Sequence, residues 1–371
     1  MTGAGERWME RAMALALRAR GATWPNPCVG CVIVRGDEVL GEGWHTRAGA
    51  PHAEIEALAD AARQARDVRG ATAYVTLEPC NHTGRTGPCS EALLAAAVAR
   101  VAVGAADPNP KATGGAVRLR AAGVEVLDGV LAERCRRLNP WFHARHALGR
   151  PSVTLKWAAT LDGAVSTESG DSKWITSEAA RADAHRERAA HHAVVCGVGT
   201  LLADAARLSP RGVPLEAHGA PARIVLDTWL RTPPDAPFVQ EPVGRAIVAC
   251  GTGADPAREA ALRRAGAELW RLPTGPRGVD LAALCARCLA EDLPSLFVEG
   301  GRQVLGAFIE ARLADRVRAY LAPRILGGHG AHLGPVALAR EPQRIAEALD
   351  LRDATVESVG GCFVVEGWLA D

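Results

Sequence analysis

The spacing of apolar positions in the first 148 residues predicts a mixture of helices and strands. Apolar side chains recur at helical spacing from Arg7 to Arg20 and from His52 to Ala65. Between them, VGCVIVRGDEVLGEGWH has the pattern of two strands joined by a turn at Gly36-Asp37. Further strands are predicted over 73–77, 100–105 and 124–130, and further helices over 90–99, 117–122 and 131–147.

The pattern changes near residue 150, where Gly149 and Pro151 precede a new apolar strand, PSVTLKWAAT. Beyond it, strands alternate with helical segments, which is typical of an α/β domain with a largely parallel sheet. The last residues, ATVESVGGCFVVEGWLA, resemble a closing antiparallel hairpin. We therefore expect an α/β protein of two domains, residues 1–148 and 149–371.

Composition narrows the class of protein. A length of 371 residues fits about two domains of roughly 150 residues each. Hydrophobic residues at 48% and charged residues at 23% exclude a wholly disordered or fibrous chain. The formal charge of +1 gives no support for a strongly basic nucleic-acid-binding protein.

The spacing of the cysteines and the lengths of the apolar stretches indicate the cellular compartment of the protein. The ten cysteines follow no secreted framework, and the N-terminal segment lacks the uninterrupted apolar core of a signal peptide. No uncharged apolar stretch reaches the roughly 18 residues that a membrane span needs. We expect a cytoplasmic protein with reduced thiols and no membrane partner.

Three separated segments carry the strongest chemical signal: His52-Ala53-Glu54, Pro79-Cys80 and Cys89. A catalytic zinc ion takes three protein ligands and leaves its fourth position to water. His52, Cys80 and Cys89 would supply those ligands, and the metal would generate hydroxide near neutral pH. Glu54, two residues after His52, would move protons as the catalytic acid and base, as in the H-x-E…P-C-x-x-C pattern of zinc nucleobase deaminases.

This metal pattern has alternatives and one departure. An HAE sequence on a helix is most often ordinary helix, and a lone Cys80 or Cys89 is most often a buried apolar residue. Cys80 and Cys89 enclose eight residues, NHTGRTGP, instead of two. The pairs at 28/31 and 285/288 also have C-x-x-C spacing but lack a complementary cluster nearby in the sequence.

Two glycine turns follow predicted strands in the second half. They are Gly197-Val198-Gly199-Thr200 and Glu299-Gly300-Gly301, each leading into a helical pattern. Backbone N–H groups and a helix dipole at such a turn can bind a phosphate or pyrophosphate. Either turn alone is equally compatible with an ordinary connection between a strand and a helix, and no full G-x-G-x-x-G is present.

The first half resembles a known enzyme family. HAE followed by TLEPCNHTGRTGPC, with PNPCVG and GEGWH before it, is similar to the deaminase domain of the bifunctional riboflavin-biosynthesis deaminase/reductase. The resemblance implies a cytidine-deaminase-like domain that acts on a phosphoribosylamino-diaminopyrimidinone. It also implies substrate contacts, with Asn26 and His45 lining the base pocket and the cysteine loop facing substrate through His82, Arg85 and Thr86.

The second half resembles the reductase domain of the same family, which has a dihydrofolate-reductase-like fold. The matching segments are KWAATLDGAVSTESGDSKWIT, CGVGTLLAD, RIVLDTWLRTP and VEGG. The resemblance implies NADPH contacts from Ala158, Trp174, Thr200, Asp204 and the run Gly301, Arg302, Gln303, Val304, Leu305, Gly306 and Ala307. It implies substrate contacts from Ser172, Arg188, Leu208, Arg211 and Glu299.

Lys156 and Asp204 are candidates for proton handling or charge stabilisation during the reduction. Their alternatives are a solvated lysine at a strand end and a helix-capping aspartate. Members of the family usually read ADDPxLTVR after the first glycine turn, whereas this chain reads ADAARLSPR over residues 203–211. A looser loop is therefore expected there.

Together these features predict a bifunctional enzyme of riboflavin biosynthesis. Two three-layer α/β domains would deaminate 2,5-diamino-6-(5-phosphoribosylamino)pyrimidin-4-one with one Zn²⁺ per chain and then reduce its ribose to a ribityl chain with NADPH. We expect a homo-oligomer that binds this small molecule and no nucleic acid. Two other hypotheses remain: a nucleic-acid deaminase with an accessory domain, and a non-enzymatic scaffold with structural zinc and a degenerate reductase half.

Overall fold

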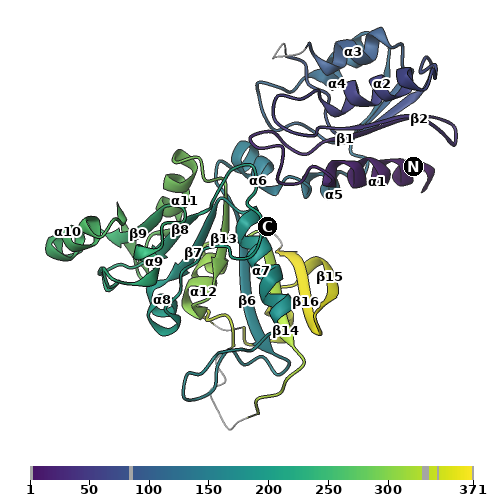
Figure 1. The fold of residues 1–371 in the computed structure, drawn as a ribbon. Coiled ribbons are helices and arrows are strands. Elements are labelled where there is room, and N and C mark those ends of the chain that lie inside the picture. Colours follow the sequence, from purple (N-terminus) through teal and green to yellow (C-terminus); the bar gives the residue numbers. More distant parts are fainter. Residues whose placement is uncertain (1–2, 83–86, 328–333, 341, 370–371) are drawn as a thin grey trace. The chain divides into compact units, whose positions relative to one another are not determined.

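The chain forms two compact units, Met1–Gly149 and Arg150–Asp371, each described here by itself. The computed structural model describes residues 3–82, 87–327, 334–340 and 342–369 (Figure 1). Within these ranges, no helix combines the length and the apolar character needed to cross a bilayer. All ten cysteines are buried and free of disulfide bonds.

The first unit is built on a five-stranded sheet of order β2-β1-β3-β4-β5. β1 is antiparallel to β2 and β3, whereas β3, β4 and β5 are parallel. The predicted hairpin around Gly36-Asp37 is confirmed, since β1 and β2 flank that turn. The strands are β1 (Gly30–Arg35), β2 (Glu38–Trp44), β3 (Thr72–Leu77), β4 (Arg100–Ala105) and β5 (Glu125–Leu127).

Helices cover both faces of this sheet and complete three layers. α1 (Gly3–Leu17) and α5 (Ala132–Arg136) pack against the face that carries Val32, Val34 and Ala102. The opposite face, with Ile33, Val75 and Val101, packs against three helices. These are α2 (Ala53–Arg63), α3 (Cys89–Ala95) and α4 (Gly115–Ala121).

The helix predicted over residues 131–147 is wrong as a single element. It divides into α5, α6 (Pro140–His143) and a short π-helix (Ala144–Leu148). Pro140 has no N–H for the helix ladder, so a break occurs before it. Asn139 at the break accepts from the Cys28 N–H at 2.6 Å and donates to the Cys28 carbonyl at 2.8 Å. The two residues are 111 positions apart in the sequence, so the local spacing of apolar residues does not reveal the contact that fixes the break.

The second unit contains a nine-stranded sheet of order β10-β9-β8-β7-β13-β6-β14-β16-β15 (Figure 1). In this order, the strands from β10 to β14 are parallel to one another, and β14 is antiparallel to β16. The terminal hairpin β15–β16 is antiparallel, as predicted. The sequence did not predict β10. The strands are β6 (Ser152–Thr160), β7 (Ala193–Gly197), β8 (Ala222–Leu226), β9 (Ala246–Gly251), β10 (Glu268–Leu272), β13 (Ser295–Glu299), β14 (Arg316–Ala322), β15 (Leu351–Val359) and β16 (Cys362–Leu369).

Helices again cover both faces of the sheet. α11 (Leu281–Ala290) and α12 (Arg302–Glu310) bury their apolar faces on one side. The other side carries α7 (Glu178–Ala190), α8 (Val198–Asp204), α9 (Pro237–Gln240) and α10 (Pro256–Arg264). Smaller elements are the two-stranded ribbon of β11 (Thr274–Gly275) and β12 (Gly278–Val279) and a 3₁₀ turn (Ile345–Glu347).

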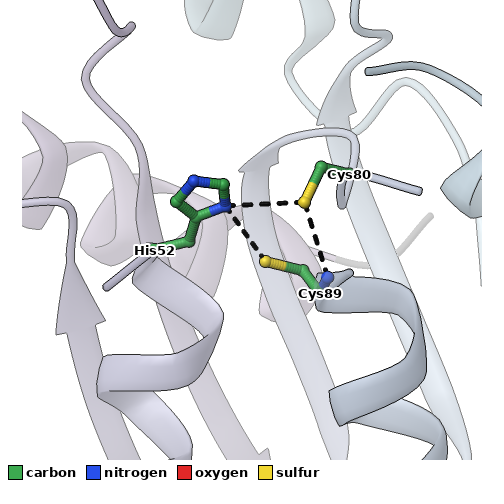
Figure 2. A group of neighbouring side chains, drawn as sticks. All are labelled: His52, Cys80 and Cys89. Atoms are coloured by element: carbon green, nitrogen blue, oxygen red, sulfur yellow. Dashed lines mark hydrogen bonds between the residues drawn. The ribbon is translucent and has the colours of Figure 1, made fainter. Parts of the chain in front are cut away.

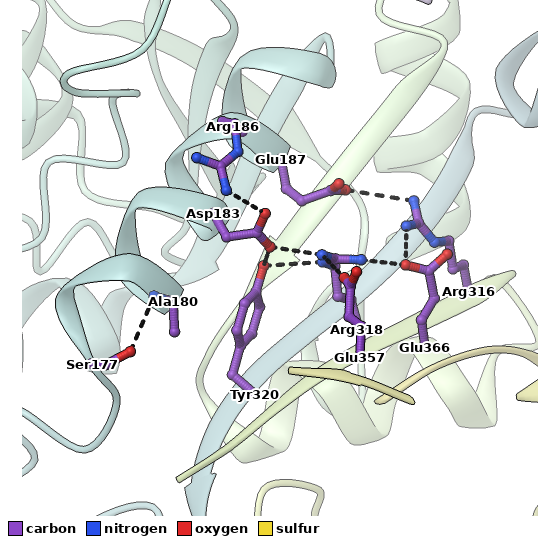
Figure 3. Close-up of polar contacts among 10 residues, drawn as sticks. All are labelled: Ser177, Ala180, Asp183, Arg186, Glu187, Arg316, Arg318, Tyr320, Glu357 and Glu366. Atoms are coloured by element: carbon purple, nitrogen blue, oxygen red, sulfur yellow. Dashed lines mark hydrogen bonds and ion pairs between the residues drawn. The ribbon is translucent and has the colours of Figure 1, made fainter. Parts of the chain in front are cut away.

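A buried network of charges holds α7 to β14 (Figure 3). Asp183 accepts hydrogen bonds from Arg318 at 2.7 Å and from the Tyr320 hydroxyl at 2.8 Å. One helical turn later, Glu187 lies 3.5 Å from Arg316. Because residues four apart share a helix face, this network fixes how α7 is rotated about its axis. The network therefore also fixes the direction in which side chains on the adjacent face of α7 point.

Candidate functional site

Three predicted ligands from separate segments converge in the first unit (Figure 2). His52 directly precedes α2, Cys80 follows β3, and Cys89 is the first residue of α3. The His52 Nδ1 atom lies 3.2 Å from the Cys89 sulfur and 3.5 Å from the Cys80 sulfur. The three ligand atoms all lie within 4.8 Å of one another.

This spacing fits a tetrahedral zinc ion. At a tetrahedral angle, Zn–N and Zn–S bonds of about 2.0 and 2.3 Å separate nitrogen and sulfur ligands by about 3.5 Å. In the described part of the chain, no other cluster of three His, Cys, Asp or Glu side chains meets this geometric condition. Two thiolates and an imidazole are also the donor set that zinc prefers over hard cations such as Mg²⁺.

The electrostatics of the two thiols favour a bound cation. Hydrogen bonds from Cys89 and His52 lower the pKa of the Cys80 thiol to about 4. The hydrogen bond to Cys80, together with burial, raises the pKa of Cys89 far above its ordinary value. The protein alone therefore stabilises one thiolate and disfavours the second. A divalent cation would offset the repulsion between the two neighbouring thiolates, since metal ligation favours the deprotonated form of both thiols.

Glu54 lies in the first turn of α2 and is 3% exposed. Burial raises the pKa of its carboxyl group above the ordinary value, and the Cys89 side chain hydrogen-bonds to it. A buried carboxyl group with a raised pKa beside a candidate metal site is suited to accept and return a proton.

Asn26 and His45 lie together close to the metal ligands. The His45 Nδ1 atom is 3.0 Å from the Pro51 carbonyl, and its Nε2 atom is 3.1 Å from the Asn26 amide nitrogen. A carbonyl can only accept, so Nδ1 carries the proton and Nε2 accepts from Asn26. Burial lowers the pKa of His45, which keeps the ring neutral. His45 therefore orients Asn26, and its ring lies 5.6 Å from that of His52.

The cysteine loop is described only in part. His82 is exposed at the start of the loop, whereas Arg85 and Thr86 lie outside the described residues. Their predicted substrate contacts therefore stay predictions.

Two carboxyl groups near the metal ligands were not singled out from the sequence. Glu78 accepts hydrogen bonds from the Thr113 hydroxyl and from the N–H groups of Gly114 and Ala116, at 3.0–3.1 Å. Burial raises the pKa of Asp107 to about 6, and the charges of Glu78 and Cys80 add to the shift. The sequence gives a weak indication of both residues, because each follows a predicted strand. The two strands are parallel, so their carboxyl ends meet at one edge of the sheet.

In the second unit, a buried carboxylate joins two of the predicted site cations. Glu299 ends β13 and pairs in register with Lys156 on β6. The Lys156 Nζ atom lies 3.6 Å from Glu299, and Arg188 from α7 makes a two-pronged ion pair with the same carboxylate. Burial alone would raise the pKa of Glu299, but Arg188 and Lys156 hold it at about 2. The alternative of a solvated strand-end lysine is wrong, since the Lys156 side chain is 18% exposed and ion-paired.

The substituted loop after α8 is anchored despite its unusual sequence. The Ser209 hydroxyl donates to Glu241 at 2.7 Å, and the buried Arg223 donates to the Arg207 carbonyl at 3.3 Å. Leu208 is 2% exposed, and the Ser209 carbonyl accepts from Arg188 at 3.1 Å. These contacts hold residues 207–209 beside Arg188, contrary to the looser loop expected from the sequence.

Asp204 is the last residue of α8, whose N-cap is Gly197, so the helix N-cap alternative is wrong. Its carboxylate accepts from the Ser172 hydroxyl at 3.4 Å, and Lys173 donates to its carbonyl at 3.2 Å. Asp204 and Ser172, predicted from distant segments, therefore lie together.

The two predicted glycine turns are also neighbours. Gly300 and Gly301 have φ values of +67° and +73°, and a Cβ at Gly301 would lie 3.2 Å from the Thr200 hydroxyl. β7 and β13 pair in parallel, so both turns lie at the same sheet edge. The N–H groups of Val304 and Leu305 donate to the Gly301 carbonyl, and those of Arg302 and Gln303, in the first turn of α12, have no acceptor inside the helix. This cradle fits the pyrophosphate of a dinucleotide.

The remaining predicted cofactor contacts vary in exposure. Ala158 lies on β6 on the same face as Lys156, and Trp174 is 60% exposed with the Arg181 guanidinium 4.4 Å from its ring. The side chain of Leu305 packs in the core, Gly306 lies against the Ala337 carbonyl, and Ala307 continues α12.

Comparisons with known proteins agree with both units. The cytidine and deoxycytidylate deaminase zinc-binding region matches residues 3–105, and the RibD C-terminal domain matches residues 151–364. Riboflavin biosynthesis protein RibD of Actinobacillus pleuropneumoniae is 40% identical over 354 residues, 95% of this chain and 92% of that protein.

Two solved structures are similar over 99% of both chains. RibD of Acinetobacter baumannii, form 1, has 35% identity and a TM-score of 0.77. The diaminohydroxyphosphoribosylaminopyrimidine deaminase/5-amino-6-(5-phosphoribosylamino)uracil reductase of Thermotoga maritima has 32% identity and a TM-score of 0.77. The predicted fold class and the family resemblance are confirmed.

Proposed function

The chain belongs to the RibD family of riboflavin-biosynthesis enzymes, with a deaminase and a reductase domain, and from this premise we propose its two reactions and the residues that perform them. Residues 1–148 deaminate 2,5-diamino-6-(5-phosphoribosylamino)pyrimidin-4-one to the corresponding uracil. Residues 149–371 then reduce the ribose to a ribityl chain. Membership in an enzyme family overturns the hypothesis of a non-enzymatic scaffold.

The observation that carries the proposal is the convergence of His52, Cys80 and Cys89 beside the buried carboxyl group of Glu54. These residues come from three segments that the fold brings together. One Zn²⁺ held by the three ligands supplies Lewis acidity that brings the pKa of water towards neutrality.

Glu54 moves the proton in the deamination. Its carboxylate takes a proton from the attacking water as oxygen bonds to the ring carbon, and returns it to the amino group as the C–N bond breaks. Asn26, held by His45, orients the pyrimidine base. His82, Arg85 and Thr86 contact the rest of the substrate, including its phosphate.

The reductase pocket positions an opened ribosylamine against NADPH, which supplies the hydride. Thr200 and the start of α12 hold the cofactor phosphates, with Ala158, Trp174 and Asp204 as further contacts. Lys156, ion-paired with Glu299, stabilises the ribose oxygen or donates a proton to it as the ring opens. Ser172, Arg188, Leu208, Arg211 and Glu299 contact substrate.

Two variants test the separation of the sites. Glu54→Ala is expected to abolish ammonia release while leaving NADPH oxidation on the deaminated intermediate. Asp204→Asn is expected to impair only the reduction. A coupled assay of ammonia and NADPH, with zinc content measured on the same samples, reads both outcomes.

Glu56→Ala, on the same helix turn as Glu54, is the matched control and should keep both activities. A folded Glu54→Ala protein that loses both activities together would contradict the assignment of separate sites. Unchanged turnover of Asp204→Asn would remove its proposed role. Ammonia release from single-stranded DNA would favour the nucleic-acid deaminase hypothesis instead.

A further inference from the structure

Lys156 contacts two different side chains, one on each neighbouring strand of the sheet. β6, which carries Lys156, lies between β13 and β14. On β13, the Glu299 carboxylate lies 3.6 Å from the Lys156 Nζ atom. On β14, the centroid of the Tyr320 ring lies 5.7 Å from the same atom, which is over the ring. A ring face attracts an ammonium group that lies within about 6 Å of its centroid.

The register of the strands places these side chains on one face of the sheet. Lys156 pairs with Glu299 on β13 and with Arg318 on β14. Tyr320 pairs with Ala158, two residues further along β6. Because side chains alternate along a strand, Tyr320 is the diagonal neighbour of Lys156 on the face that α7 covers.

The ion pair with Glu299 does not by itself fix the direction of the ammonium group. Its length of 3.6 Å exceeds the roughly 2.7–2.9 Å of a charge-assisted hydrogen bond. Both oxygens of the carboxylate already accept hydrogen bonds from Arg188. Glu299 therefore attracts Lys156 without determining where its N–H groups point, and the ring on the other side supplies a second restraint.

The ring of Tyr320 is itself held in place. Tyr320 is 1% exposed, and its hydroxyl donates to Asp183 at 2.8 Å and accepts from Arg318 at 3.0 Å (Figure 3). Burial raises the pKa of Tyr320, so the hydroxyl stays protonated and remains a donor. Burial alone would raise the pKa of Asp183, but hydrogen bonds from Arg318 and Tyr320 lower it. A charged carboxylate on α7 thus fixes the orientation of the ring.

Arg318 is a second cation beside Lys156, and its own partners keep it away from the lysine. The two cations are in register on adjacent strands, so their charges repel. The guanidinium group of Arg318 is bound by three carboxylates, those of Asp183, Glu357 and Glu366 (Figure 3). Repulsion from this anchored cation favours a Lys156 side chain that points towards β13.

We propose that Tyr320 is a positioning residue for the reduction, whose ring, held by Asp183, directs the Lys156 ammonium group towards the ribose oxygen. The inference rests on the proposed function, which assigns that oxygen to Lys156, and adds a residue that acts through the lysine. Negative charge develops on the oxygen as the ribose ring opens, so the direction of the ammonium group matters most in the transition state. Loss of the aromatic ring should therefore lower kcat more than it changes KM.

Two substitutions separate the ring from the hydroxyl. Tyr320→Leu should lower kcat for NADPH oxidation about tenfold, while KM for the deaminated substrate and the dissociation constant of NADPH stay within about twofold. Tyr320→Phe keeps the ring and loses the bonds to Asp183 and Arg318, so its kcat should stay within about threefold of the wild type. Ammonia release should be unchanged in both variants.

Phe297→Leu is the matched control. Phe297 is a fully buried aromatic residue on β13, two residues before Glu299, and its ring centroid lies 4.9 Å from that of His191. This variant removes a ring from the same sheet and should lower the thermal unfolding midpoint much as Tyr320→Leu does, yet keep kcat. An equal loss of kcat in the two variants would overturn the proposal, since it would show a general effect of core packing.

A double-mutant cycle with Lys156→Met tests whether Tyr320 acts through the lysine. In the Lys156→Met background, Tyr320→Leu should cause no further loss of kcat, whereas two independent residues would add their effects. A further tenfold loss would overturn the proposal. If Lys156→Met keeps full turnover, the role that the proposed function gives to Lys156 fails, and that of Tyr320 with it. If Lys156→Met loses turnover but Tyr320→Leu keeps it, the role of Tyr320 alone fails.

The contact between the ring and the lysine can be measured without turnover. The chain has three lysines, Lys111, Lys156 and Lys173, so lysine-selective ¹³C labelling gives few NMR signals, and that of Lys156 is absent from Lys156→Met. The ring current should shift the ε-methylene protons of Lys156 upfield in the wild type and in Tyr320→Phe, and not in Tyr320→Leu. An unshifted signal in the wild type would overturn the proposal even if the leucine variant does not fold.

Discussion

Glu54 and Glu299 are both buried carboxyl groups, yet their neighbours shift their pKa values in opposite directions. Burial raises the pKa of Glu54. At Glu299, burial has the same effect, but Arg188 and Lys156 outweigh it and hold the pKa at about 2. Glu54 is thus suited to exchange a proton, whereas Glu299 stays charged and positions two cations.

The Glu299 ion pair predicts a pH-dependent stability. The folded-state pKa of about 2 lies below an unfolded-state value of about 4.3, so the stabilisation is present above about pH 4.3 and is lost as the pH falls towards 2. Glu299→Gln should lower the free energy of unfolding at neutral pH by about 3 kcal/mol and flatten this acid dependence. Urea unfolding at several pH values measures both effects.

The control for this prediction is Glu268→Gln, which removes a carboxylate that is 43% exposed and paired with Arg245. An exposed pair of this kind contributes less than about 1 kcal/mol. Equal losses in the two variants would show that burial does not set the strength of the Glu299 pair.

At the scale of elements, two glycines on β2 allow α2 to lie directly on the sheet. A Cβ at Gly41 would lie 2.2 Å from the Ala57 carbonyl oxygen, and one at Gly43 would lie 2.3 Å from the Ala57 nitrogen. Both are backbone atoms, so no side-chain rotation can make room. The close approach places the start of α2, with His52 and Glu54, beside the segment after β3 and the start of α3.

Gly43→Ala should therefore disturb the metal site from a distance. Overpacking costs about 1–3 kcal/mol, and the displaced helix should reduce zinc content together with deaminase activity. Thermal unfolding and metal analysis of the same preparation measure the two effects.

Gly5→Ala on α1 provides the contrast, because its added Cβ would meet only the Tyr74 ring, at 3.8–3.9 Å. The stability of that variant should stay the same or rise by about 0.5–1 kcal/mol through helix propensity. Full zinc occupancy in Gly43→Ala would contradict the argument from close packing.

At the scale of the whole molecule, each unit has its own sheet and its own buried clusters. Each also has its own proposed ligand, zinc in the first unit and NADPH in the second. A ligand that binds only the folded form stabilises the unit that holds it.

Calorimetry of the full chain should therefore show two unfolding transitions with different ligand responses. A zinc chelator should lower the midpoint of one transition, and NADPH should raise the midpoint of the other. At a hundredfold excess over its dissociation constant, NADPH should add about 2.7 kcal/mol. A single transition that responds to both ligands would contradict independent units.

Local patterns were sufficient for most elements and insufficient where a distant contact decides the outcome. β7 and β9 were predicted from their continuous apolar runs. A strand that is buried on both faces has such a run, so it can be recognised without knowledge of the strands it pairs with. β10, with the sequence ELWRL, was missed because its place is set by pairing with β9. The helix predicted over 131–147 failed because Asn139 binds the backbone of Cys28.

The sequence by itself was sufficient to predict the proposed metal ligands, the proposed acid–base carboxyl group and both glycine turns, because these depend on residue type and spacing within short segments. Only the tertiary structure decided which carboxyl group stays charged, that Asp107 lies close enough to Glu78 and Cys80 to feel their charges, and where His185 contacts Arg188 and Arg211. Those properties depend on burial and on distances between side chains far apart in the chain, and only the packed sheets set such distances.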